Sequence, residues 1–585
     1  MQSRCRAALL LLVGALAFLS PLLLHSDERE TPLPQATSTA DGPPRLIVLV
    51  VFDQLRGDYL QRWRELYGRD GFQRLCTGGA WFTNCHYPYA NTVTAAGHAS
   101  IATGCCPAEH GIVGNEWRDR VSGELVESGF TGRYERVPYR PPAPPKRGGL
   151  AKKEKFNVSP ELLLAPTIGD ALKEATDGKG RVVGLSMKER AAALPAGQHP
   201  DACYWFDTDT GMFVTSTYYR NRVHSWVASF NERKPADYWF GRTWQRLWPG
   251  LNYASYSGPD EVQGEGIGVK QGQAFPHPLT GGLKRPAPEY YKALLNSPFG
   301  NDLLLDLALR ALETERLGQR DVPDFLSLSF SCNDVVGHCW GPDSQEVLDV
   351  TLRSDLIIKR LLAHLDARVG RGRYVLVMTA DHGVCALPEV SRSKGIAAGR
   401  LFPDVLTRGA DAYLNEKFPS EKGSGRWLNG RSEMWMYLNQ RLIQDRGLRA
   451  PDVESALAGW LKQQPGILTV YTRSQLLSEP MPYDPFAEAV RKSFYPERCG
   501  DVAFILKPYF VLHTPLANGT NHGTPHPYDT HVPLIVYGGG VQAGMRTEAV
   551  TPLAAAAILA EAVHIKPPAR AQAPAPRGLF LAPAN

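Results

Sequence analysis

The stretch RLIVLVVF (45–52) is a continuous apolar run rich in β-branched side chains, and Asp53 follows it at once. A run of strand length without polar alternation is typical of a strand buried on both faces, as in a parallel sheet covered by helices. Three further runs share this design, namely DFLSLSFS (324–331), YVLVMTA (374–380) and HVPLIVYG (531–538). The chain therefore contains several candidate strands of one buried sheet.

Amphipathic stretches of helical period lie between these runs, for example NDLLLDLALRALETE (301–315) and EVLDVTLRSDLIIKRLLAHLDARV (346–369). The alternation predicts an α/β fold in which helices flank a mostly parallel central sheet. We expect one large domain over 45–565. Two cap-like insertions are expected within it, around 203–290, which is rich in aromatic residues, Gly and Pro, and around 386–510, which has no dominant period.

Composition narrows the class of protein. The 585 residues suffice for a large core, and their ordinary composition excludes a wholly disordered or fibrous chain. The formal net charge is only +5, and no long run of Lys or Arg is present. We therefore expect no nucleic-acid binding, whereas a small anionic substrate is compatible with this charge. Residues 566–585 are rich in Pro and Ala and are expected to form a poorly ordered tail.

The N-terminal residues follow the pattern of an export signal. Arg4 and Arg6 precede a largely apolar run over 7–24, and a polar, Pro-rich linker follows at 26–44. The run is near the lower limit for spanning a bilayer, and no clear small-x-small cleavage site follows it. Residues 1–25 are therefore predicted to be a signal peptide or a membrane anchor. We expect the protein to be periplasmic, at the cell surface or secreted.

The cysteines provide no obvious metal site. Ten are present, and none forms the CxxC pair of a thiolate zinc site. Cys332 and Cys339 are close enough in sequence to form a disulfide, although connectivity cannot be read from sequence. We expect the cysteines to be structural or inert.

Metal-competent side chains follow three of the buried runs. Asp53 follows the first, Asp334 and His338 follow the second, and Asp381 and His382 follow the third. Ligands of open α/β sheets bind at the carboxyl ends of the strands, and a mixture of carboxylates and imidazoles suits Zn²⁺. The i, i+4 spacing of Asp334 and His338 permits one face of a helix or, given the glycines around them, a loop. The sequence thus predicts a metal site at one edge of the sheet.

A further histidine ligand is expected from the loop NGTNHGTPHPYDTHVP (518–533), which precedes the fourth run. The loop contains His522, His526 and His531, and spacing alone cannot choose among them.

The segment NTVTAAGHASIATG (91–104) is predicted to begin a helix near Thr94, with small residues that allow its backbone to approach a ligand closely. A helix N-terminus favours phosphate because it combines unpaired N–H groups with the positive end of the helix dipole. A Thr at this position is usually only a helix cap. Beside a metal ion, however, its hydroxyl can ionise near neutral pH and act as a nucleophile.

Several motifs together resemble one family. With Asp53, they resemble the alkaline phosphatase superfamily, in particular its phosphate-monoester-cleaving branch of PafA-type alkaline phosphatases, and they occur in family order over nearly the whole chain. The motifs are VTAAGHASIATG (93–104), GIVGN (111–115), SMKER (186–190), NDVVGH (333–338), TADHG (379–383) and NHGTPHPYDTHVP (521–533).

The resemblance implies two Zn²⁺ ions and selects His522 from the three histidines of its loop. It also implies that Thr94 is the nucleophile. The ligands that it implies are Asp53, Thr94, Asp381 and His382 around one ion, and Asp334, His338 and His522 around the other.

Three more residues match the family pattern. Asn115 matches the Asn that contacts a phosphoryl oxygen, and Lys188 and Arg190 match the Lys-x-Arg pair of the monoesterase branch. Cations at these positions would stabilise the dianionic phosphoryl group of a monoester. His98, in the same segment as Thr94, is expected to support the site, either by packing or by contacting residues that bind the metal.

The implied activity is metal-dependent hydrolysis of small-molecule phosphate monoesters through a phosphothreonine intermediate. One alternative is the phosphodiesterase/nucleotide pyrophosphatase branch, which shares the zinc ligands, Thr and Asn but is not expected to carry Lys-x-Arg. The other alternative is a non-catalytic, zinc-stabilised surface binding module. The segment CCPAE (105–109) superficially resembles the sulfatase motif Cys-x-Pro-x-Arg, but Glu109 stands where that motif has Arg.

Overall fold

The computed structural model describes residues 43–138, 158–420, 423–478, 484–513 and 519–581. The expected signal peptide or anchor at 1–25 lies outside the described residues, as does nearly all of the linker at 26–44. Within the described ranges, no helix is both long and apolar enough to cross a membrane.

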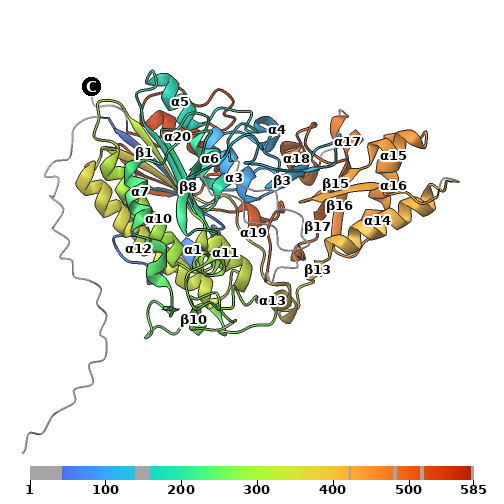
Figure 1. The fold of residues 1–585 in the computed structure, drawn as a ribbon, viewed down its shortest axis with the longest axis horizontal. Helices are drawn as coiled ribbons and strands as arrows, with labels where there is room; N and C mark the ends of the chain where they lie inside the picture. The colour runs from blue at the N-terminus through green and yellow to red at the C-terminus, as the bar shows by residue number, and fades with distance from the viewer. Residues whose placement is uncertain (1–42, 139–157, 421–422, 479–483, 514–518, 582–585) are drawn as a thin grey trace, which may run out of the picture.

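A ten-stranded mixed sheet forms the centre of the molecule (Figure 1). Five neighbouring strands, β12, β1, β11, β6 and β7, run parallel, which confirms the predicted α/β class. Across the sheet the strands are β20 (Gly544–Arg546), β2 (Ala80–Phe82), β19 (Leu534–Gly538), β12 (Tyr374–Thr379), β1 (Leu46–Phe52), β11 (Asp324–Phe330), β6 (Val182–Ser186), β7 (Ala202–Asp207), β8 (Met212–Ser216) and β5 (Arg136–Val137).

Strand β1 is the central strand that the opening run predicts. Each of its residues is fully buried, as expected for a strand covered on both faces. It pairs in parallel with β11 and β12, with Phe52 opposite Phe330 and Val51 opposite Thr379. The carboxyl ends of these three strands therefore lie side by side at one edge of the sheet.

The fourth apolar run differs from the expectation in its direction. Strand β19 begins at Leu534 and runs antiparallel to both β12 and β2. The chain enters β19 from the loop that crosses the carboxyl edge of the sheet, with no crossover helix before it. It can therefore only run back antiparallel.

Helices cover both faces of the sheet (Figure 1). The amphipathic stretches predicted at 301–315 and 346–369 form α10 (Phe299–Thr314) and α12 (Gln345–Arg368), which pack together on one face. The other face is covered by α3 (Thr94–Thr103), α5 (Ile168–Ala175), α6 (Glu189–Ala196) and α20 (Ala554–Ala562).

A second lobe, drawn in orange in Figure 1, is built from the segment around 386–510. It has its own apolar core, and its helices α14 (Pro403–Lys417) and α16 (Ala450–Lys462) pack on its sheet. This sheet is antiparallel, in the order β14 (Leu428–Ser432), β15 (Trp435–Leu438), β17 (Val502–Leu506) and β16 (Ile467–Thr472).

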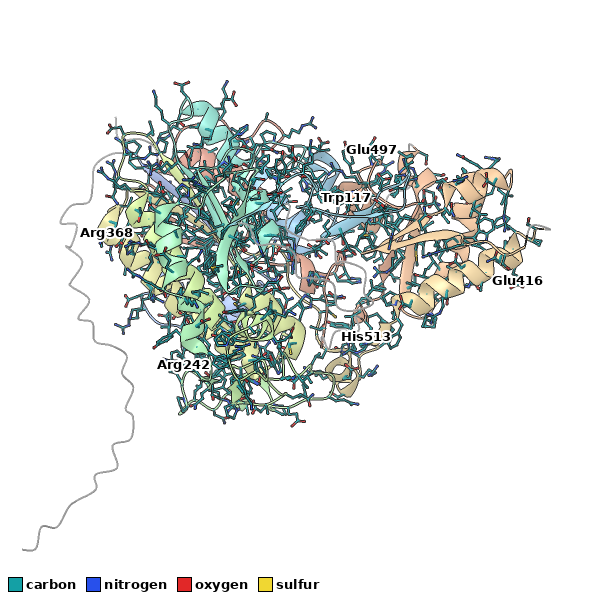
Figure 2. All side chains as sticks on the ribbon, in the orientation of Figure 1. Trp117, Arg242, Arg368, Glu416, Glu497 and His513 are labelled. Carbon is teal, nitrogen blue, oxygen red and sulfur yellow. The ribbon has the colours of Figure 1, made fainter. Side chains whose placement is uncertain are left out.

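The two lobes meet in a shared apolar cluster. Trp117 lies at their junction in Figure 2 and belongs to the cluster that joins Ala95 and Ala99 of α3 to Trp435 of β15. The second lobe is thereby packed against the helix that begins at Thr94.

Two expected boundaries need correction. The segment predicted as an insertion from 203 begins with β7 and β8, which belong to the central sheet. The Pro/Ala-rich segment is not a poorly ordered tail over 566–581, because Leu579 is fully buried and Phe580 bridges to Val541. These apolar side chains pack on the core and anchor the segment, which could not be predicted from its high Pro content.

The nine cysteines in the described part of the chain are free thiols. Cys332 and Cys339 therefore do not form the disulfide that their spacing permits.

Candidate active site

Three aspartates meet at the carboxyl edge of the parallel strands. Asp53 follows β1, Asp381 follows β12, and Asp334 lies in the first turn of α11 (Cys332–Trp340), which follows β11. Their side chains are buried, with Asp53 and Asp381 0% exposed and Asp334 4% exposed. Buried like charges are costly unless cations accompany them, so this site requires positive charge.

Helix α11 places the first group of candidate metal ligands. The segment that contains Asp334 and His338 is a helix and not a loop. Gly341 caps its C-terminal end with a φ of +88°. Asp334 and His338 share one face of it, with His338 Nε2 3.2 Å from Asp334 Oδ1. His522 Nε2 lies 3.7 Å from the same oxygen. These three residues form a group that could hold a metal ion.

A second group surrounds His382. Its Nε2 atom lies 3.5 Å from Asp53 Oδ1, 3.4 Å from Asp381 Oδ2 and 3.4 Å from Thr94 Oγ1. Both carboxylates are buried. Asp53 Oδ1 accepts no hydrogen bond from the described residues, and Asp381 Oδ2 lies 3.2 Å from His98 Nδ1. Buried carboxylate oxygens of this kind are normally satisfied, so their presence beside an imidazole fits a bound cation. Asp334 also lies within reach of Asp53 and His382, so its carboxylate stands between the two groups.

The three histidines of these groups are held in one tautomer. A carbonyl oxygen can only accept a hydrogen bond, so each Nδ1 must carry the proton. Each Nε2 is then free to bind a metal, and such backbone contacts orient metal-binding imidazoles. The Nδ1 partners are the carbonyl oxygens of Thr520 for His338, Thr92 for His522 and Gly383 for His382, at 2.9, 2.8 and 2.9 Å.

The other two histidines of the 518–533 loop lie elsewhere. His526 donates from Nε2 to the Leu506 carbonyl at 2.8 Å, and His531 donates from Nε2 to the Thr83 carbonyl at 2.9 Å. The structure thus places only His522 of this loop beside Asp334.

The charges of the site are strongly coupled. Burial, together with the nearby Asp334 and Asp381 carboxylates, raises the pKa of Asp53 well above its usual value. Burial opposes ionisation of Asp334 as well, but Lys188 and His338 outweigh it and hold the pKa of Asp334 well below its usual value. Burial lowers the pKa of His382, which keeps its imidazole neutral.

Helix α3 presents Thr94 as its first residue and lies close against the end of β12. A Cβ added at Gly97 would lie 2.3 Å from the Asp381 carbonyl oxygen, so only glycine permits this approach. His98 donates from Nδ1 to the Thr94 carbonyl at 2.8 Å, and its Nε2 lies 2.7 Å from Ser329 Oγ. His98 Nδ1 also lies 3.2 Å from Asp381 Oδ2, so His98 supports both the helix and a carboxylate of the second ligand group.

Asn115, Lys188 and Arg190 border the same site. Asn115 Oδ1 accepts a hydrogen bond from the Ala95 N–H in the first turn of α3, at 2.9 Å. Lys188 precedes α6 and Arg190 lies in its first turn, where the Arg190 guanidinium contacts Glu189 Oε1 at 3.0 Å. Glu189 is thus an ion-pair partner of Arg190.

The Lys188 ammonium lies between two of the aspartates. Its Nζ is 2.6 Å from Asp53 Oδ2 and 2.5 Å from Asp334 Oδ2. Burial opposes the charged form of Lys188, but Asp334 and Asp53 outweigh it and raise its pKa. Lys188 is therefore a permanent cation that links the two ligand groups.

Gln54 is a site residue that sequence analysis missed. Its backbone N–H donates to Asp381 Oδ1 at 3.1 Å, and its side-chain Nε2 donates to Asp334 Oδ1 at 2.7 Å. Its φ of +70° is unusual for a residue other than glycine, and such strain is often found at functional sites. The only available signal was its position directly after Asp53.

Glu433, from the turn between β14 and β15 of the second lobe, was also missed. Burial raises the pKa of its carboxyl, while the charge of Arg431, the Asn115 backbone and the charge of Arg190 oppose this rise, so Glu433 lies close to Asn115 and Arg190. Its φ is +48°. The second lobe therefore reaches the residues expected to hold the phosphoryl group.

The geometry agrees with the similarities to known proteins. Residues 47–529 match the family model "Type I phosphodiesterase / nucleotide pyrophosphatase". The chain is 33% identical to alkaline phosphatase PafA of Elizabethkingia meningoseptica over 86% of this chain and 88% of that protein. It is 31% identical to alkaline phosphatase PhoV of Synechococcus elongatus over 90% of this chain and 91% of that protein.

The fold agrees as well. A crystal structure of wild-type alkaline phosphatase PafA matches with a TM-score of 0.83 and 31% identity, over 92% of this chain and 100% of that one. The chain therefore belongs to the type I phosphodiesterase/nucleotide pyrophosphatase family and is a hydrolase of the alkaline phosphatase superfamily.

Proposed function

We propose that this enzyme hydrolyses phosphate monoesters of small molecules through a phosphothreonine formed on Thr94. The observation that carries the proposal is the position of the Thr94 hydroxyl. It lies at the N-terminal end of α3 and 3.4 Å from His382 Nε2, beside the buried carboxylates of Asp53 and Asp381. A helix N-terminus and adjacent cations are the environment that a phosphoryl group requires.

The proposed cofactor is a pair of Zn²⁺ ions, since neutral imidazoles and carboxylates without thiolates suit this metal. When bound, the ions would supply Lewis acidity that lowers the pKa of the Thr94 hydroxyl and of water and stabilises the leaving oxygen. The residues that would hold them are Asp53, Thr94, Asp381 and His382 for one ion, and Asp334, His338 and His522 for the other.

The protein's own groups then perform two displacements. Thr94 Oγ, having lost its proton, forms a bond to phosphorus as the bond from phosphorus to the ester oxygen breaks. The departing alcohol takes up a proton from solvent. Water next attacks phosphorus and releases a proton to solvent, the bond to Thr94 Oγ breaks, Thr94 Oγ regains a proton from solvent, and inorganic phosphate leaves. Asn115, Lys188 and Arg190 orient the phosphoryl oxygens and offset their charge throughout.

Phosphodiester hydrolysis is the second candidate, because the matching family model is named for phosphodiesterases. A monoester dianion carries one more negative charge than a diester, and the cations Lys188 and Arg190 favour it. Comparing kcat/KM for p-nitrophenyl phosphate and bis(p-nitrophenyl) phosphate tests this choice. We expect the monoester to be preferred by roughly 100-fold or more; preference for the diester would overturn the proposal. Bound zinc with no turnover of either ester would indicate a binding module instead.

We also propose that the protein is exported, on the basis of Arg4, Arg6 and the apolar run that follows them. Cell fractionation with detection of the full-length and processed chains would test this. Recovery only from the cytoplasm would contradict it.

A further inference from the structure

A cavity of about 200 Å³ lies between the two lobes, directly beside the ligand groups. One wall comes from the loop that carries His522, together with Cys385 just beyond Asp381 and His382. The opposite wall comes from the second lobe. No residue of this wall has a role in the proposed reaction.

The position of the cavity indicates that it contacts the alcohol portion of the substrate rather than the phosphoryl group. His522 borders it on one side, and Glu116 and Glu433, which flank Asn115, border it on the other. In the proposed reaction, Asn115 holds a phosphoryl oxygen, and the leaving oxygen faces the Asp334, His338 and His522 group. An ester bound in this way has its alcohol portion next to the cavity.

The second-lobe wall is largely apolar. Met434, Ile505, Leu506, Val511 and Leu512 contribute to it, and all of them except Leu512 are at most 6% exposed. These side chains belong to the turn after β14, to β17 and to β18 (Phe510–Leu512). Binding an apolar group against such a wall is favourable because it removes apolar surface from water.

Two charged side chains, Arg431 and Glu433, interrupt the apolar wall. Arg431 lines the cavity, its Nη1 donates to the Glu433 carbonyl, and its buried Nε makes no hydrogen bond within the described residues. An unpaired buried donor favours a ligand that brings an acceptor. The volume is below the roughly 300–1,000 Å³ of typical pockets for drug-sized ligands, so it suits a group of about one ring.

We propose that this cavity binds the alcohol portion of the substrate, and that the preferred substrates are phosphate monoesters of compact, mainly apolar alcohols of about one ring in size. The inference rests on the proposed monoesterase function. It assigns the second lobe a role in substrate selection, through a wall whose chemistry matches an apolar leaving group.

Benzyl phosphate and methyl phosphate test the proposal, because their alcohols have similar acidity and differ mainly in the ring. The ratio of their kcat/KM values therefore reports contacts with the ring. For the wild-type enzyme with zinc bound, we expect benzyl phosphate to be preferred about tenfold or more. Leu512→Trp, which fills the cavity from its rim, should reduce the ratio to about one. Leu512→Ala, which only shortens one wall, should reduce it about two- to fivefold.

Leu477→Trp provides a matched control, since Leu477 is 55% exposed on the second lobe and does not line the cavity. It should leave the ratio at the wild-type value. A wild-type ratio near one, or a ratio that neither Leu512 variant lowers, would overturn the cavity assignment while monoester hydrolysis stands. Failure of the wild-type enzyme to hydrolyse either ester would instead overturn the proposed function, and this inference with it.

Discussion

Replacing Gly337 with alanine tests whether Gln54 positions the Asp334 carboxylate. Gly337 lies in the interior of α11, and a Cβ added there would lie only 1.9 Å from Gln54 Oε1. The flexible Gln54 amide would have to move, which breaks its 2.7 Å hydrogen bond to Asp334 Oδ1. Loss of such a contact to a metal-binding group costs about 10–100-fold in metal affinity or activity. Alanine in place of glycine inside a helix, by contrast, gains about 1 kcal/mol of helix stability.

We therefore expect Gly337→Ala to weaken Zn²⁺ binding and kcat/KM by about 10–100-fold without lowering the unfolding temperature of the metal-free protein. Chelator competition, steady-state kinetics and thermal unfolding measure the three quantities. Gln54→Ala removes the same hydrogen bond without the clash, so the double variant should lose little more than either single variant. Wild-type zinc affinity and activity in Gly337→Ala would refute the positioning role of Gln54.

Three further predictions concern charge, metal and pH. Lys188→Ala and Arg190→Ala should each lower kcat/KM for p-nitrophenyl phosphate by about 100–1,000-fold and for the diester by less than about tenfold, and equal losses would contradict the monoester assignment. EDTA should abolish hydrolysis and added Zn²⁺ should restore it; activity that persists in metal-free protein would contradict the metal site. Burial, followed by the charge of Arg498, lowers the pKa of His110 from 6.5 to about 3, so the folded state favours its neutral form. This contribution to stability is complete above pH 6.5 and is lost at about 1.4 kcal/mol per pH unit as the pH falls towards 3. Urea unfolding at pH 7 and pH 5 measures the loss, which should shrink in His110→Gln; an unchanged pH dependence in that variant would contradict this assignment.

The parallel centre of the sheet could be predicted because its strands are buried on both faces. Such strands must be apolar throughout. For that reason β1, β11 and β12 can be recognised in the sequence as continuous apolar runs. Strand direction has no such signature. The run that forms β19 has the same composition in either direction, and only its connection decides that it runs antiparallel.

The sequence alone predicted some residues of the site and missed others. Asp53 and Asp381 directly follow buried strands, so their meeting at one edge follows from topology alone. Thr94 could not be separated from an ordinary helix cap without the family resemblance. The roles of Gln54 and Glu433 depend on backbone angles of +70° and +48° and on contacts with residues far away in the sequence, for which local patterns carry no signal.

The most direct test of the account is to locate the phosphoryl group during turnover. The zinc-loaded enzyme is mixed with a ³²P-labelled monoester, quenched in acid, digested and analysed by mass spectrometry, with Thr94→Ala as the control. We predict label on Thr94 of the wild-type enzyme, and neither label nor substantial turnover in Thr94→Ala, which should still bind zinc. Rapid turnover by Thr94→Ala, or label on another residue of the wild-type enzyme, would contradict the central claim that Thr94 is the nucleophile.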